Sequence, residues 1–85
     1  MKYKVELTKS AEKELLRLPT KDQHKISKVL FELQDNPRPH GYKKLKGEDN
    51  LYRVRIGNYR AIYTIKDQIL LVLVFDIGHR KDIYE

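Results

Sequence analysis

Three arginines in the middle of the chain are the first candidates for chemistry. They occur in the segment 51–60, which reads Leu-Tyr-Arg-Val-Arg-Ile-Gly-Asn-Tyr-Arg. Side chains alternate along a strand, so Arg53 and Arg55 project from the same face. The next two residues after Ile56 are Gly-Asn, a typical hairpin turn that brings Arg60 near them on the returning strand. The spacing therefore predicts three guanidinium groups on one sheet face.

Such a cluster favours an anionic ligand, because like charges side by side on neighbouring strands repel each other. Guanidinium groups match the geometry of phosphate oxygens. The net charge is +6, and residues 37–60 carry seven basic side chains against two acidic ones. This block favours a polyanionic partner such as RNA or DNA, and Lys43, Lys44 and Lys46 within it are candidate RNA ligands. The alternative interpretation is that these charges bind no ligand and only keep an exposed edge hairpin soluble.

A second group of candidates lies in the segment 78–84. It combines the imidazole of His79, the cations Arg80 and Lys81, and the phenol of Tyr84. Histidine titrates near neutral pH, so His79 is a candidate for proton transfer. Arg80 and Lys81 are candidate phosphate ligands, and Tyr84 is a candidate to stack on a base or to move a proton. For a single loop histidine, an ordinary surface position is the alternative.

Several classes of site find no support in the sequence. The absence of cysteine excludes disulfides, thiolate catalysis and cysteine-containing zinc sites. No histidine and carboxylate pair has metal-ligand spacing, so we expect neither a metal nor a cofactor. The longest apolar run has seven residues, 69–75, whereas a membrane helix needs about 20. With no apolar stretch typical of a signal peptide at the N-terminus, we expect a cytoplasmic protein without membrane contact.

The length indicates a single domain, residues 1–85. Alternation predicts a first strand over 3–7. Helical spacing predicts a helix that starts after Thr8 or Ser10 and ends at Pro19, then a second helix capped by Thr20. The Asn-Pro-Arg-Pro sequence at 36–39 stops that second helix.

The rest of the chain reads as a basic loop and three strands. The predicted segments are the loop 41–50, the strands 51–56, 60–65 and 69–77, and the turns 57–58 and 66–68. The last strand is apolar on both faces, which indicates a central strand covered on both sides. We therefore predict an α+β fold of order β-α-α-β-β-β. Its small, twisted, mostly antiparallel sheet carries the N-terminal helical hairpin on one face.

Six motifs follow one another in a specific order. They are Ser-Ala-Glu-Lys-Glu-Leu at 10–15, Leu-Pro at 18–19, Asn-Pro-Arg-Pro at 36–39, Lys-Lys-Leu-Lys-Gly at 43–47, the arginine segment at 51–63, and Gly-His-Arg-Lys-Asp-Ile-Tyr at 78–84. In this order and at this length the whole chain resembles the RelE/ParE toxin superfamily, especially its RelE-like members. The resemblance implies the toxin of a type II toxin–antitoxin system that cleaves mRNA on the ribosome without a metal ion.

The resemblance also implies site residues. The positions that carry basic or aromatic site residues in RelE-like toxins match Arg53, Arg55, Arg60, Arg80 and Tyr84. The implied reaction is attack of the substrate's 2′-hydroxyl on the adjacent phosphate, which leaves a 2′,3′-cyclic phosphate. One departure is that the paired strand lysines of the best-studied pattern are arginines here, and arginine is a poor proton carrier. Proton transfer is then open between His79, Tyr84 and Lys81.

Two other functions stay open. One is inhibition of DNA gyrase in the manner of ParE-like toxins, against which the full basic set argues. The other is an inactive module that binds RNA or the ribosome without cleaving. The implied partners are mRNA in the ribosomal A site and a small acidic antitoxin, partly disordered, of the RelB class or another. We expect the toxin–antitoxin complex to be a heterotetramer or larger.

Overall fold

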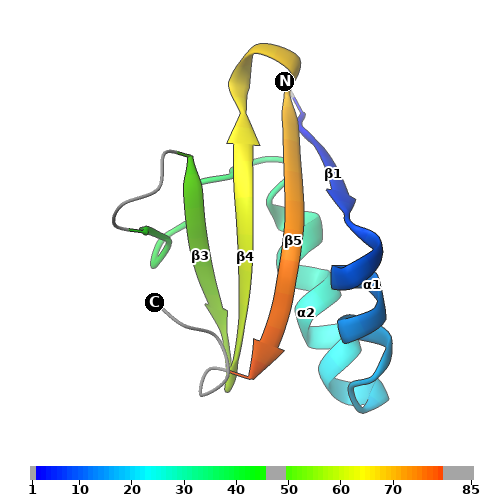
Figure 1. The fold of residues 1–85 in the computed structure, drawn as a ribbon. Helices are drawn as coiled ribbons and strands as arrows, with labels where there is room; N and C mark the ends of the chain where they lie inside the picture. The colour runs from blue at the N-terminus through cyan, green and yellow to red at the C-terminus, as the bar shows by residue number, and fades with distance from the viewer. Residues whose placement is uncertain (1, 46–49, 80–85) are drawn as a thin grey trace.

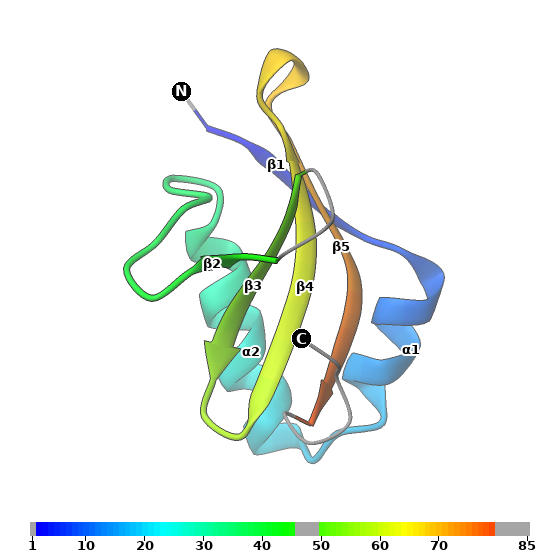
Figure 2. The ribbon, with the colours of Figure 1, turned by 60° about the vertical axis from the view of Figure 1, so that its left-hand side comes forward.

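The computed structural model describes residues 2–45 and 50–79. Within this part of the chain, five strands form one sheet in the order β1-β5-β4-β3-β2, with two helices on one face (Figures 1 and 2). The elements are β1 Lys4–Leu7, α1 Lys9–Leu16, α2 Thr20–Glu32, β2 Lys43–Lys44, β3 Leu51–Ile56, β4 Tyr59–Lys66, the 3-10 turn Asp67–Ile69, and β5 Leu71–His79. β1 runs parallel to β5, and the other pairs are antiparallel. The predicted α+β class and its mostly antiparallel sheet are confirmed.

The first helix of the hairpin is capped as the sequence predicts, but the second helix is capped differently. Thr8 caps α1, because its Oγ1 accepts a hydrogen bond from the Ala11 N–H at 3.1 Å. α2 begins at Thr20 itself, with Pro19 at the N-cap and no side-chain capping bond. The predicted capping role of Thr20 is therefore wrong. Proline at the N-cap pre-sets the backbone for the turn between the helices, since its ring fixes φ.

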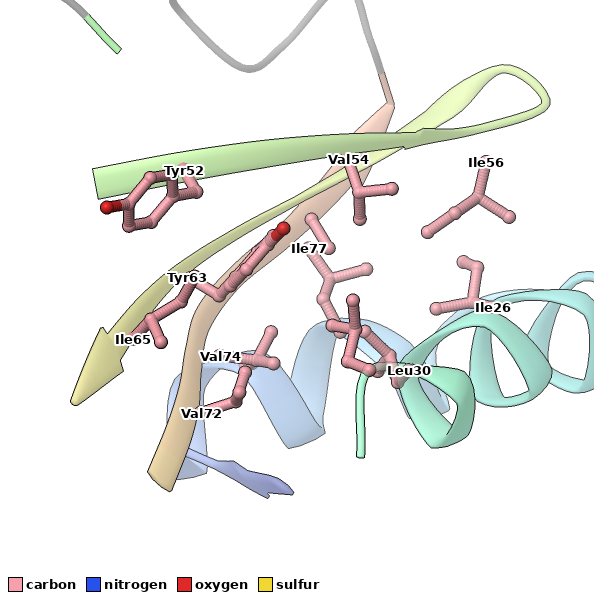
Figure 3. Close-up of a cluster of buried hydrophobic side chains, with 13 residues drawn as sticks. Ile26, Leu30, Tyr52, Val54, Ile56, Tyr63, Ile65, Val72, Val74 and Ile77 are labelled. Atoms are coloured by element: carbon pink, nitrogen blue, oxygen red, sulfur yellow. The ribbon is translucent and has the colours of Figure 1, made fainter. Parts of the chain in front are cut away.

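The core lies between the helices and the inner face of the sheet (Figure 3). α2 contributes Ile26 and Leu30, and the alternate residues Tyr52, Val54 and Ile56 of β3 belong to the same buried cluster. Each of these side chains is buried, and full burial of one such side chain stabilises a fold by about 1.5–3 kcal/mol. This packing fixes which face of β3 points toward the helices, and so fixes the opposite face as well.

Two predictions for the later strands need correction. The segment 41–50 is not a loop throughout, because Lys43–Lys44 pairs with β3 as the short strand β2. Two lysines in a row give no alternation signal, so this strand depends on its partner. The last strand begins at Leu71, not Ile69, and lies between β1 and β4, with β4 in the middle of the sheet. Its outer face is only half-buried at Leu73.

A polar cluster ties the segment after α2 to the far end of the sheet. Arg38 donates two hydrogen bonds to the Asp67 carboxylate, at 3.3 and 2.9 Å. These bonds hold the pKa of Asp67 below its usual range, and the Tyr3 hydroxyl adds to the effect. Beneath the cluster, the buried Tyr63 hydroxyl donates to the Pro37 carbonyl at 2.8 Å.

No helix within residues 2–45 and 50–79 has the length and apolar character needed to cross a membrane.

Candidate functional site

The sheet face turned away from the helices carries the three central arginines. Arg55 on β3 lies directly opposite Arg60 on β4, and Arg53 lies opposite Ile62. Residues opposite each other in an antiparallel pair point to the same face, about 5 Å apart at Cβ. The hairpin turn forms as the sequence predicts, with Gly57 at φ 60°. We call the face that holds Arg53, Arg55 and Arg60 the arginine face.

The three arginines differ sharply in exposure. The Arg55 side chain is exposed, whereas Arg53 and Arg60 are only 4% and 7% exposed. Buried charges need partners, because taking an ion out of water is costly. Accordingly, both Arg53 and Arg60 interact with other groups of the protein. A phosphate in solution can therefore reach Arg55 directly, whereas Arg53 and Arg60 present almost no surface to solvent.

The lysines of β2 divide between the two faces of the sheet. Lys43 pairs with Arg53 and extends the arginine face, whereas Lys44 pairs with Tyr52, whose ring is part of the core. Both lysines are exposed. The register thus joins Lys43 to the arginines and leaves Lys44 on the other side. Four further candidates lie outside the described residues: Lys46, Arg80, Lys81 and Tyr84.

His79 lies on the opposite face of the sheet from the arginines. It pairs with Tyr59, and the two rings meet edge to face with centroids 5.7 Å apart. The Tyr59 hydroxyl in turn donates to Asp22 on α2 at 3.0 Å, which raises the pKa of Tyr59. Because Asp22 belongs to a helix, this chain of contacts places His79 on the helix side. The structure therefore does not bring His79 together with Arg60.

Sequence reasoning missed one residue on the arginine face. Asp76 on β5 is exposed and pairs with Ile62, whose other neighbour across the sheet is Arg53. Gly78, the next outward residue of β5, pairs with Arg60. No signal in the sequence separates Asp76 from an ordinary strand-end carboxylate. Within the described part of the chain, no three histidine, aspartate or glutamate side chains gather in a way that suits a metal ion.

The fold and this face define a small basic α+β domain, with helices on one side of the sheet and guanidinium groups on the other. Residues 5–84 match the family described as the ParE toxin of the type II toxin-antitoxin system, parDE. Toxin RelE3 of Methanocaldococcus jannaschii is 36% identical, over 96% of this chain and 96% of its own. The mRNA interferase toxin RelE of Escherichia coli K12 is 28% identical, over 95% of this chain and 86% of its own.

A solved structure gives the same result. The archaeal RelE–RelB complex from Pyrococcus horikoshii matches with a TM-score of 0.84 and 27% identity, covering 98% of this chain and 100% of that chain. Matches of this extent, in sequence and in fold, establish the family. The chain belongs to the RelE/ParE superfamily of toxins from type II toxin–antitoxin systems.

Proposed function

We propose that this toxin cleaves mRNA in the ribosomal A site, without a metal ion or cofactor, through attack of the RNA's own 2′-hydroxyl on the adjacent phosphate. The observation that carries the proposal is the cross-strand pair Arg55–Arg60, with Arg53 on the same face. Fixed cations stabilise the charge that builds up on the pentacoordinate phosphate, and one such donor is typically worth 10²–10³ in rate. The name of the E. coli relative, an mRNA interferase, supports the proposal.

The arginines have separate tasks in this proposal. Arg55 and Lys43 are exposed and make the first contact with the RNA backbone. Arg53 and Arg60 are buried, and they stabilise the reacting phosphate once RNA binding has uncovered them. A guanidinium group acts more strongly on a phosphate in such water-poor surroundings, because screening is weaker there. By the family resemblance, Arg80 and Tyr84 complete the site. As further basic residues, Lys46 and Lys81 bind the flanking backbone.

A cognate antitoxin is the second partner in the proposal. The chain has a net charge of +6, which suits an acidic, partly disordered protein of the RelB class or another. The Pyrococcus horikoshii structure that it resembles is a RelE–RelB complex. We propose that the complex is a heterotetramer or larger, and that the toxin acts in the cytoplasm.

Controlled expression tests the cleavage proposal. Induction of the toxin without its antitoxin should arrest growth, and mapped mRNA 5′ ends should fall within translated codons. Arg60→Ala should abolish these cuts. Arg17→Ala is the matched control, because Arg17 is an exposed arginine at the end of α1, next to Glu14. Intact mRNA during arrest by the unaltered toxin would contradict the proposal.

Inhibition of DNA gyrase is the second candidate function, since the matching family is described as a ParE toxin. A gyrase inhibitor would arrest growth through protein-linked DNA breaks, with mRNA left intact. The same induction experiment, with chromosomal DNA assayed alongside the mRNA, separates the two functions. Breaks in DNA without cuts in mRNA would favour the ParE-like activity.

A further inference from the structure

An irregularity in β5 decides which of its side chains reach the arginine face. Val72 and Val74 point into the core, so strict alternation would send Asp76 inward as well. Instead, the pairing of β5 with β4 shifts by one residue at this point, and Phe75 is the extra residue. Beyond it, Ile77 occupies the core and Asp76 is exposed. β-bulges of this kind re-aim side chains and are common beside active sites.

The same bulge has two consequences for proton transfer. It turns Asp76 outward, and it turns His79, three residues later, toward Tyr59 and the helices. In a regular strand, in which Phe75 also paired with a residue of β4, the Asp76 and His79 side chains would each lie on the opposite face. The arginine face therefore receives a carboxylate and loses an imidazole.

Asp76 lies within reach of the arginines. Arg60 pairs with Gly78, so Asp76, two residues earlier on β5, is the diagonal neighbour of Arg60 on the same face. Such diagonal neighbours are roughly 7–8 Å apart, so a phosphate bound at Arg60, once RNA binding has uncovered it, would lie close to the Asp76 carboxylate. Gly78, directly opposite Arg60, contributes no side chain to this face. Among the described residues, Asp76 forms no ion pair with a lysine or arginine.

The proposed reaction needs a proton acceptor that arginine does not supply, since a guanidinium group stays protonated. We propose that Asp76 is the general base of this toxin, an inference that rests on the cleavage function proposed above. The 2′-hydroxyl gives its proton to the Asp76 carboxylate as the bond from O2′ to phosphorus forms. Arg53 and Arg60 stabilise the pentacoordinate phosphate. The bond from phosphorus to O5′ then breaks, and O5′ takes a proton from water.

Single-turnover cleavage on programmed ribosomes tests the role of Asp76. Asp76→Asn preserves the size of the side chain but removes its basic oxygen. We expect the rate to fall by about 10²–10⁴, the usual contribution of a general base, while binding to the programmed ribosome is unchanged. The matched control is Glu6→Gln, because Glu6 is an exposed carboxylate that β1 presents on the same sheet face, paired with Lys4 at 3.0 Å. This control should cleave at the unaltered rate.

A modified substrate separates a base from an acid. An mRNA with sulfur in place of the bridging O5′ has a leaving group that departs without a proton, but its 2′-hydroxyl must still be deprotonated. With this substrate Asp76→Asn should remain as slow, relative to the unaltered toxin, as with ordinary mRNA. Recovery of the full rate would overturn the assignment, because it would mean that Asp76 delivers a proton instead of accepting one.

The outcomes also separate this inference from the proposed function. If the unaltered toxin cleaves and Asp76→Asn cleaves equally fast, the assignment of the base is wrong and the nuclease stands. If the unaltered toxin does not cleave mRNA on ribosomes at all, the proposed function and the role of Asp76 fall together. A lower affinity of Asp76→Asn for the programmed ribosome, with an unchanged rate at saturation, would also overturn the inference.

Discussion

The Arg55 side chain lies directly opposite that of Arg60, beside the hairpin turn at Gly57. The two guanidinium groups share a face but not an environment, since Arg55 is exposed and Arg60 is buried. In the proposed cleavage function, Arg55 is the cation that RNA meets first, whereas Arg60 is reached only after RNA binding has uncovered it. It predicts that the two positions affect different steps, binding for Arg55 and the chemical step for Arg60.

Arg55→Gln should weaken the binding of single-stranded RNA and lower its dependence on salt. Loss of one phosphate contact should reduce the slope of log K against log salt concentration by about 0.7. Fluorescence anisotropy with a short RNA at several salt concentrations measures this slope. Arg17→Gln, an exposed arginine on the helix side, should leave it unchanged. Equal slopes for Arg55→Gln and the unaltered chain would show that Arg55 does not contact the RNA backbone.

His79→Asn should leave the single-turnover cleavage rate unchanged. The imidazole packs edge-on against Tyr59 on the helix side of the sheet, opposite to the arginine face. The measurement is the ribosome assay used for Asp76→Asn, run on both variants in parallel. A large loss of rate for His79→Asn at full ribosome binding would return proton transfer to the imidazole.

Tyr63→Phe should destabilise the fold by about 1–3 kcal/mol, the cost of leaving a buried polar group without its partner. The Tyr63 side chain is fully buried, and its hydroxyl donates to the Pro37 carbonyl at 2.8 Å. Burial also raises the pKa of Tyr63, so the hydroxyl keeps its proton at neutral pH. Urea unfolding measures the change. Tyr42→Phe is the control, because Tyr42 is 38% exposed and should lose little.

The polar cluster of Arg38, Asp67 and Tyr3 predicts that the fold loses stability in acid. Hydrogen bonds from Arg38 lower the pKa of Asp67 in the folded state. A lowered pKa stabilises the fold above the unfolded value of about 3.9, and that stabilisation disappears as the pH falls through the folded value. Asp67→Asn should therefore unfold more easily than the unaltered chain at pH 7, and the difference should shrink toward pH 3.

Urea midpoints at the two pH values provide the test. Asp35→Asn is the control, since the Asp35 carboxylate is exposed and lies 3.9 Å from the Lys2 ammonium. A difference between Asp67→Asn and the unaltered chain that stays constant from pH 7 to pH 3 would show that the carboxylate's charge is not the cause.

The sequence alone determined the features that depend on local backbone geometry. Alternation placed Arg53 and Arg55 on one face, and the glycine at 57 supplied the positive φ that returns Arg60 beside them. The helical hairpin and the order of the main strands along the chain followed from spacing and from breaks at proline. These signals are readable because the residues that produce them are neighbours in the chain.

Only the tertiary structure decided which other side chains join the arginines. The bulge at Phe75 exists in the pairing of β5 with β4, and it exchanges His79 for Asp76 on the arginine face. The burial of Arg53 and Arg60 likewise depends on what packs around the strands. Both features arise from contacts between segments distant in sequence, so no local period carries them, and a shift of one residue is enough to reverse a side chain's face.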